Sequence, residues 1–166
     1  GFWMSLHEWD ILGRNPPFVG IGNYRELMKD DLWWLTLRQT LQFSVQTVTS
    51  LVVAGLGAAL IAFQNFRGRG LTRVIYYFPA TLSVAVVGLV WQWLLNYEYG
   101  LINYALSLFG VPKIRWLVEP ALMLPSLTLA SVWSGFGFPM LIFLAGLTDI
   151  PAHLYDAAKV DGANAW

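Results

Sequence analysis

The sequence has no cysteine and little charge. Only 12% of its 166 residues are charged, whereas soluble domains carry about a quarter. Without cysteine there are no disulfides, no thiolate catalysis and no Cys-ligated metal site. The two histidines, His7 and His153, are far apart and do not form a metal-binding spacing. Ten basic and ten acidic residues balance, so no basic excess indicates nucleic-acid binding.

Charge is missing altogether from three long stretches, residues 39–66, 74–97 and 120–148. The shortest holds 24 residues, which would extend about 36 Å as a helix at about 1.5 Å per residue. This exceeds the roughly 30 Å thickness of the hydrocarbon core of a bilayer. Backbone polar groups in lipid must pair within their own segment, which favours helix. The sequence therefore predicts an all-α, polytopic transmembrane helical bundle with about three full membrane helices.

The connecting segments predict the orientation. Residues 67–73 hold three arginines and no acid, and the positive-inside rule places such a loop in the cytoplasm. Because the first residue is Gly1 and the apolar start has no features of a signal peptide, we expect a piece of a longer protein. The predicted order is 1–9 end of a membrane helix, 10–35 outer loop, 36–64 membrane helix, 67–73 cytoplasmic loop, 74–97 membrane helix, 98–119 outer loop, 120–148 membrane helix and 149–166 cytoplasmic helix region.

Within the outer segment 10–35, Asn23 lies three residues before Glu26, a pattern typical of a helix N-terminus. Farther along, Pro125 and Pro139, with Gly135 and Gly137 between them, predict that the third span is kinked or broken.

Polar residues recur on single faces of two spans. Gln42 and Gln46 lie on one face of the first span, and the third span carries Thr128, Ser131 and Ser134. Amides in hydrocarbon are costly unless they are paired, so these faces should meet protein or water. Two explanations stay open for these residues: they form hydrogen bonds between helices, or they line a transport path as a polar wall. None of the three runs contains a charge, which argues against a proton relay within them.

The last 17 residues, IPAHLYDAAKVDGANAW, predict a short cytoplasmic helix. Asp149 is a candidate N-cap, and Pro151 suits the first turn. Leu154 and Ala158 share a face, and Ala157 beside them leaves a low surface on which another protein can dock. Gly162 is expected to end the helix. From these residues alone, an ordinary interfacial helix is an equal alternative.

Four segments resemble ABC-importer permeases, and the last of them contains a recognisable motif. LYDAAKVDGA resembles their EAA motif, with Asp156 in place of the commoner Glu, then Ala157, Ala158 and Gly162. FVGIGNYREL, RVIYYFPATLSVAVVGLVWQWLLN, GLINYAL and AGLTDIPAHLYDAAKVDGA resemble the sugar-type permeases, which include maltose and glycerol-3-phosphate permease subunits. They occur in the family's order and cover nearly the whole chain.

The resemblance implies the ABC type I importer fold and a non-catalytic subunit in the bacterial inner membrane that translocates a sugar or a similar solute. It implies a coupling helix on a cytoplasmic ATPase subunit, which would bind ATP and Mg, while this chain binds no cofactor. A second permease subunit, identical or homologous, and a periplasmic or lipid-anchored solute-binding protein are the other implied partners. The implied coupling residues are Leu154, Tyr155, Asp156, Ala157, Ala158, Asp161 and Gly162.

Two other classes stay open on the residues alone. A secondary transporter would more often carry charge within its spans. A membrane-embedded enzyme needs nucleophiles, histidine pairs or carboxylate clusters, which would have to lie outside these residues. No GxxxxGK[ST] loop is present, so ATP chemistry would belong to a partner.

Overall fold

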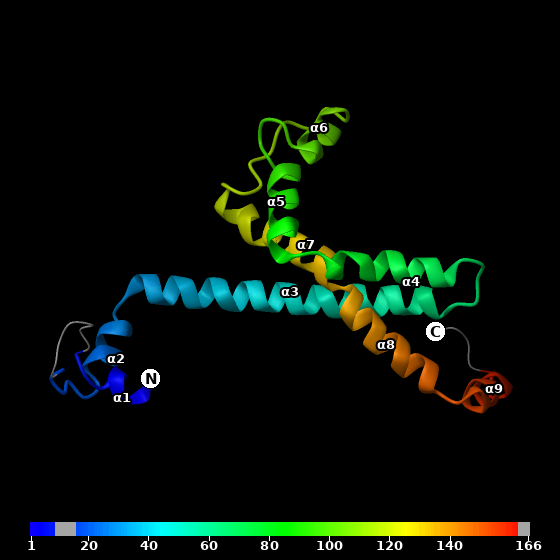
Figure 1. Cartoon of the computed structure of the whole chain (residues 1–166), viewed down its shortest axis with the longest axis horizontal. Coiled ribbons are helices and arrows are strands. Elements are labelled where there is room, and N and C mark those ends of the chain that lie inside the picture. Colours follow the sequence, from blue (N-terminus) through cyan, green and yellow to red (C-terminus); the bar gives the residue numbers. More distant parts are fainter. Residues whose placement is uncertain (9–15, 163–166) are drawn as a thin grey trace. The chain divides into compact units, whose positions relative to one another are not determined.

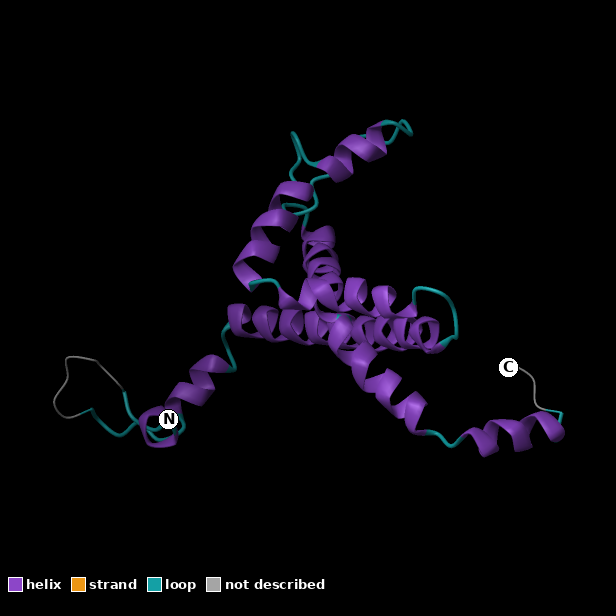
Figure 2. Cartoon of the chain, turned by 45° about the vertical axis from the view of Figure 1, so that its right-hand side comes forward, coloured by secondary structure: helices purple, strands orange, loops and turns teal. Residues whose placement is uncertain are grey.

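The computed structural model describes residues 1–8 and 16–162. Within them the chain forms helices and loops (Figure 2). An isolated β-bridge joins His7 and Phe18. The elements are α1 Phe2–Ser5, α2 Gly22–Leu27, α3 Asp31–Phe63, α4 Arg69–Tyr77, η1 Phe78–Thr81, α5 Val84–Leu94, α6 Leu101–Ser107, α7 Pro120–Gly135, α8 Gly137–Asp149 and α9 Ala152–Val160 (Figure 1). The chain divides into two compact units, Gly1–Gln42 and Phe43–Trp166.

The first unit is held together by side chains of α2. The Asn23 amide donates to the carbonyls of Ser5, at 2.9 Å, and His7, at 3.0 Å. The Ser5 and Tyr24 hydroxyls lie 2.7 Å apart. The prediction that Asn23 begins a helix is wrong, because α2 begins at Gly22 without a side-chain cap. Asn23 instead ties α2 to the segment after α1.

The first predicted span is a single helix. α3 runs from Asp31 to Phe63, and within the described residues it is the one unbroken helix long and apolar enough to cross a membrane. Two bent helix pairs would raise the number of spans to three if each pair crosses as one unit. α3 begins a few residues before the predicted start at 36 because Asp31 supplies an acidic residue in its first turn, where the helix dipole favours negative charge.

The second span is not the continuous helix that we predicted for 74–97. α4 and η1 together are bent by 96° relative to α5. Pro79 lies in η1, and Leu82 and Ser83 have extended backbones, with ψ of 146° and 137°. Proline cannot donate to a helical hydrogen bond, and the chain restarts as α5 after Ser83. The arginine-rich loop is also shorter than 67–73, because α4 begins at Arg69, directly after the left-handed turn at Gly68 (φ 101°).

The third span is interrupted, as the prolines and glycines predicted. α7 and α8 meet at Phe136 with a bend of 50°. Pro139 stands in the first turn of α8, whereas α7 continues through Pro125. The interruption therefore lies at Gly135–Gly137 and not at the first proline.

Small residues let helices pack closely at both interruptions. A Cβ on Gly137 would lie 2.6 Å from the Tyr76 carbonyl oxygen, and a Cβ on Gly55 would lie 2.9 Å from the Pro139 ring. α3, α4 and α8 meet around a core of buried residues, and Figures 1 and 2 both show α4 alongside the end of α3. This core consists of Ala58, Ala59, Ala62, Met140 and Leu144.

The chain leaves α8 through a short extended linker. Asp149 is the last residue of α8, and α9 has Pro151 at its N-cap position with no side-chain cap. The prediction that Asp149 caps α9 is therefore wrong. Gly162 stands directly after the helix with φ of 79°, and its N–H bonds to the Lys159 carbonyl. Its predicted role as the helix terminator is confirmed.

Candidate functional site

Every residue of α9 is exposed. The residues predicted to form the coupling site are all exposed: Leu154, Tyr155, Asp156, Ala157, Ala158, Asp161 and Gly162. The Asp156 carboxylate pairs with the Lys159 ammonium at 3.3 Å, and both side chains are mostly exposed. Such surface pairs contribute less than about 1 kcal/mol. Asp156 can therefore exchange Lys159 for another cation at little cost.

One aromatic contact connects α9 to the end of the long helix. The ring of Tyr155 lies 6.4 Å from the ring of Phe63, with an angle of 33° between the planes. Phe63 is the last residue of α3. Tyr155 therefore has a partner within this chain, whereas Ala157 and Ala158 are exposed.

The polar residues of the first and third spans meet at one point. The Thr128 hydroxyl lies 3.5 Å from the Gln46 side-chain oxygen and 3.4 Å from the Thr47 hydroxyl. Thr128 is only 8% exposed. A cavity of about 510 Å³ adjoins this point, lined by Val45, Gln46, Thr49, Ser50, Pro125, Thr128, Leu129 and Val132. The cavity has polar groups on both walls and apolar groups between them, a composition typical of small-molecule sites.

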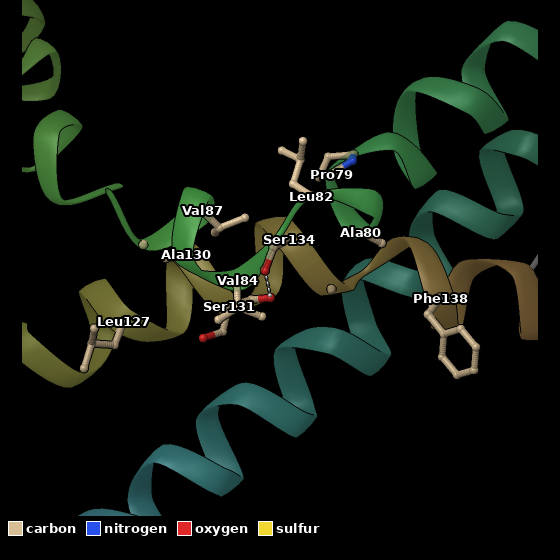
Figure 3. Close-up of a pocket in the computed structure, with 12 residues that line it drawn as sticks. Pro79, Ala80, Leu82, Val84, Val87, Leu127, Ala130, Ser131, Ser134 and Phe138 are labelled. Carbon is tan, nitrogen blue, oxygen red and sulfur yellow. Dashed lines mark hydrogen bonds between the residues drawn. The ribbon is translucent and has the colours of Figure 1, made fainter. Parts of the chain in front are cut away.

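The two serines of α7 belong to a different cavity. Ser131 and Ser134 line a space of about 430 Å³ between α7 and the break that separates η1 from α5. The Ser134 hydroxyl donates to the Ser131 carbonyl at 3.1 Å. Figure 3 shows both serines close to Val84, on the opposite wall. The hydroxyl of Ser134 is thus occupied locally.

The predicted polar wall is therefore divided. Gln46 and Thr128 come together, Ser131 and Ser134 come together elsewhere on α7, and Gln42 is an exposed residue of the first unit. Sequence reasoning missed the break beside Pro79, which forms one wall of the second cavity. The sequence FPATLS does contain a sign of this break, because a proline is followed by a serine, a residue type that is preferred at the N-cap of a helix. In the structure Ser83 has the extended backbone of an N-cap residue before α5.

The two cavities are lined by uncharged residues. In residues 1–8 and 16–162, histidine, aspartate and glutamate form no group of three that could hold an ion. The cavities offer amide and hydroxyl groups together with aliphatic walls. Such groups suit recognition of a neutral, hydroxylated solute by hydrogen bonds.

The chain is similar to permeases of named transport systems. It is 36% identical over 163 residues to the trehalose/maltose transport system permease protein MalF of Thermococcus litoralis, covering 98% of this chain and 55% of that protein. It is 34% identical over 165 residues to the glucose import system permease protein GlcT of Saccharolobus solfataricus, covering 98% of this chain and 57% of that protein. The chain thus spans about half the length of the relatives that it matches.

The fold is also that of a solved transporter. A crystal structure of a bacterial ABC transporter involved in the import of the acidic polysaccharide alginate matches with a TM-score of 0.82 at 24% identity, covering 89% of this chain and 52% of the other. Residues 51–166 match the family described as "Binding-protein-dependent transport system inner membrane component". This match includes α9 and the whole lining of the cavity at the η1–α5 break, whereas the α3 wall of the Gln46–Thr128 cavity lies before residue 51. The chain is a membrane protein that belongs to this family.

Proposed function

We propose that the chain is part of the permease subunit of an ATP-driven importer that moves a sugar across the inner membrane. Its family membership and its similarity to trehalose/maltose and glucose permeases support this function. The observation that carries the proposal is α9. It is a short helix, exposed on every side, that follows a membrane segment and carries two adjacent alanines.

α9 is proposed to dock in a groove of a cytoplasmic ATPase, which binds and hydrolyses ATP with Mg. Ala157 and Ala158 allow close approach, while Leu154 and Tyr155 supply apolar contact. Asp156 exchanges Lys159 for a donor on the ATPase, and this contact is worth more than a surface ion pair only where docking removes water from it. Asp161 and Gly162 end the helix at the edge of the groove.

The solute path is proposed to pass the Gln46–Thr128 cavity, with Ser131 and Ser134 on the neighbouring face of α7. A second permease subunit completes this path, and segment 98–119 faces outward, where a solute-binding protein delivers the sugar. One solved relative is described as a complex with an alginate pentasaccharide-bound periplasmic protein, which supports such a delivery step. The chain crosses the membrane several times, with the arginines of 67–73 inside.

Cysteine crosslinking tests the docking surface. These 166 residues contain no cysteine, so Ala157→Cys or Ala158→Cys gives one defined site per chain in a full-length permease from which any other cysteine has been removed. We expect each to crosslink to the ATPase subunit, and ATP to change the yield. Ala152→Cys is the matched control, because it is exposed on the same helix but lies more than 100° around the axis from both alanines at about 100° per residue.

A crosslink that is absent at both alanines in an intact complex would contradict the docking proposal. Equal yields at all three alanines would also contradict it, since they would show contact without a defined docking face.

A further inference from the structure

We propose that the groove between the end of α5 and α6 is an outer binding site for a neutral saccharide, where the sugar rests before it enters the membrane path. This inference rests on the proposed function for its ligand class, but nothing in that function requires a site on this loop. The groove has a volume of about 310 Å³ and is lined by Trp93, Glu98, Tyr99, Gly100, Leu101, Asn103, Tyr104, Ser107 and Lys113.

The groove is built on a rigid base. Asn103 is only 2% exposed. Its amide nitrogen donates to the carbonyl of Ile114 at 2.9 Å and, at longer range, to the carbonyls of Asn96 and Tyr97. Its oxygen accepts from the Ile114 N–H at 3.1 Å and the Trp116 indole at 3.0 Å. One side chain thus fixes both ends of the loop, so the groove exists before any ligand binds.

Three exposed aromatic side chains, Trp93, Tyr99 and Tyr104, supply flat apolar walls. A sugar ring has an apolar face of C–H groups and a rim of hydroxyls. An aromatic ring can pack on the C–H face and leave the hydroxyls free to form hydrogen bonds. Tyr and Trp also lose little conformational entropy on binding, because each has two side-chain torsions.

Polar groups stand beside these walls. The Lys113 ammonium lies 3.3 Å from the Glu98 carboxylate and 3.0 Å from the Glu98 carbonyl oxygen. Both charges line the groove, where they can bond to sugar hydroxyls as donor and acceptor. Because they neutralise one another, the groove favours an uncharged saccharide over an acidic one.

A simple membrane-interface belt does not account for this arrangement. Trp and Tyr do gather at the membrane surface, but there they need no concave surface and no carboxylate. Here the rings line a groove that also holds an ion pair and Ser107. At about 310 Å³, the groove falls at the lower end of the roughly 300–1,000 Å³ of small-molecule pockets.

Protection from labelling tests the site. Ser107→Cys places a thiol in the groove, and Phe109→Cys places one two residues away, on a side chain that is 83% exposed and does not line the groove. Full-length permease, free of other cysteines and assembled with its partners, is treated from outside with an impermeant maleimide in the presence of maltose, trehalose or glucose. At ten times the Kd, a bound sugar should slow labelling of Ser107→Cys about tenfold and leave Phe109→Cys unchanged.

Adding Tyr104→Ala to the Ser107→Cys protein should reduce the protection from about tenfold to about twofold or less, because truncation of a central aromatic contact weakens binding by about tenfold or more. Tyr104 is exposed, so the truncation leaves the core intact. Labelling that none of the three sugars slows, or protection that Tyr104→Ala does not reduce, would overturn the inference. ATP-driven uptake of the same sugars, measured on the same preparation, separates this failure from failure of the proposed function.

Discussion

The loop between α5 and α7, which we propose is the outer loop, and the helix breaks of the second unit are held together by opposite means. Around Asn103, a polar side chain bonds to backbone groups on both sides of the loop. At the breaks, close contact is possible because glycine has no side chain. Gly137 lets α8 pack directly against the backbone of Tyr76 and Tyr77. The loop can use polar groups because water competes weakly with a buried, fully bonded amide. Within a membrane span, close packing of small residues is the cheaper solution.

This difference also predicts that the loop around Asn103 is rigid, whereas the helix breaks can change conformation. Hydrogen bonds from Asn103 are directional and fix a single loop conformation. η1 packs against α7 and α8, and the extended backbones of Leu82 and Ser83 interrupt the helix between η1 and α5. We expect movement that begins at α9 to be absorbed at the helix breaks and not in the outer loop.

The largest effect is expected at the helix breaks, from Gly137→Ala. The new Cβ would lie 2.6 Å from the Tyr76 oxygen and 2.9 Å from the Tyr77 Cα, so backbone must move. Overpacking of this kind destabilises by about 1–3 kcal/mol, and we expect the upper end, seen as a lowered Tm of the purified full-length protein. Gly146→Ala in the same helix is the matched control, because nothing lies within 4 Å of its Cβ. It should stabilise by about 0.5–1 kcal/mol. Equal shifts for the two variants would contradict the account.

A somewhat smaller effect is expected in the outer loop, from Asn103→Ala. This change leaves the Ile114 and Trp116 N–H groups without their acceptor, at a cost of about 1–3 kcal/mol. The loss should be local, so hydrogen exchange should accelerate in residues 96–116 and stay unchanged in α3. Asn65→Ala serves as control, since Asn65 is exposed and makes one long bond of 3.4 Å to Arg69. Faster exchange throughout the protein would contradict the local role of Asn103.

The smallest effect on stability is expected from Thr128→Val in α7, the helix that runs from the outer loop to the α7–α8 break. The Thr128 hydroxyl makes only long contacts, 3.4 Å and 3.5 Å, so its loss should change unfolding by less than about 1 kcal/mol. If the Gln46–Thr128 cavity lies on the solute path, sugar uptake should nevertheless fall severalfold. Thr81→Val is the control, because Thr81 is exposed and bonds only within its own turn. Unchanged uptake with Thr128→Val would remove this cavity from the path.

The sequence predicted the membrane character and the interrupted third span because charge depletion, proline and glycine act locally. It missed the break after Pro79 although FPATLS contains a proline, because η1 is also held by packing against α7 and α8, which belongs to tertiary structure. Asn103 was missed for the same reason, because its partners Ile114 and Trp116 are 11 and 13 residues away.

The predicted polar wall shows what helical periodicity can predict and what it cannot. Three residues advance a helix by about 300°, so Thr128, Ser131 and Ser134 turn by about 60° at each step. They therefore cannot all meet α3. The crossing of α3 and α7 decides which of them does, and that crossing selects Thr128. Periodicity identified the polar residues, while helix packing divided them between two cavities.

The most direct measurement is uptake of labelled maltose, trehalose or glucose into vesicles that contain the full-length permease with its ATPase, second permease and solute-binding protein. We expect uptake that requires ATP, persists when ion gradients are collapsed and recovers the sugar chemically unchanged. Uptake driven by an ion gradient without ATP, or a sugar recovered in altered form, would contradict the account and favour a secondary transporter or an enzyme.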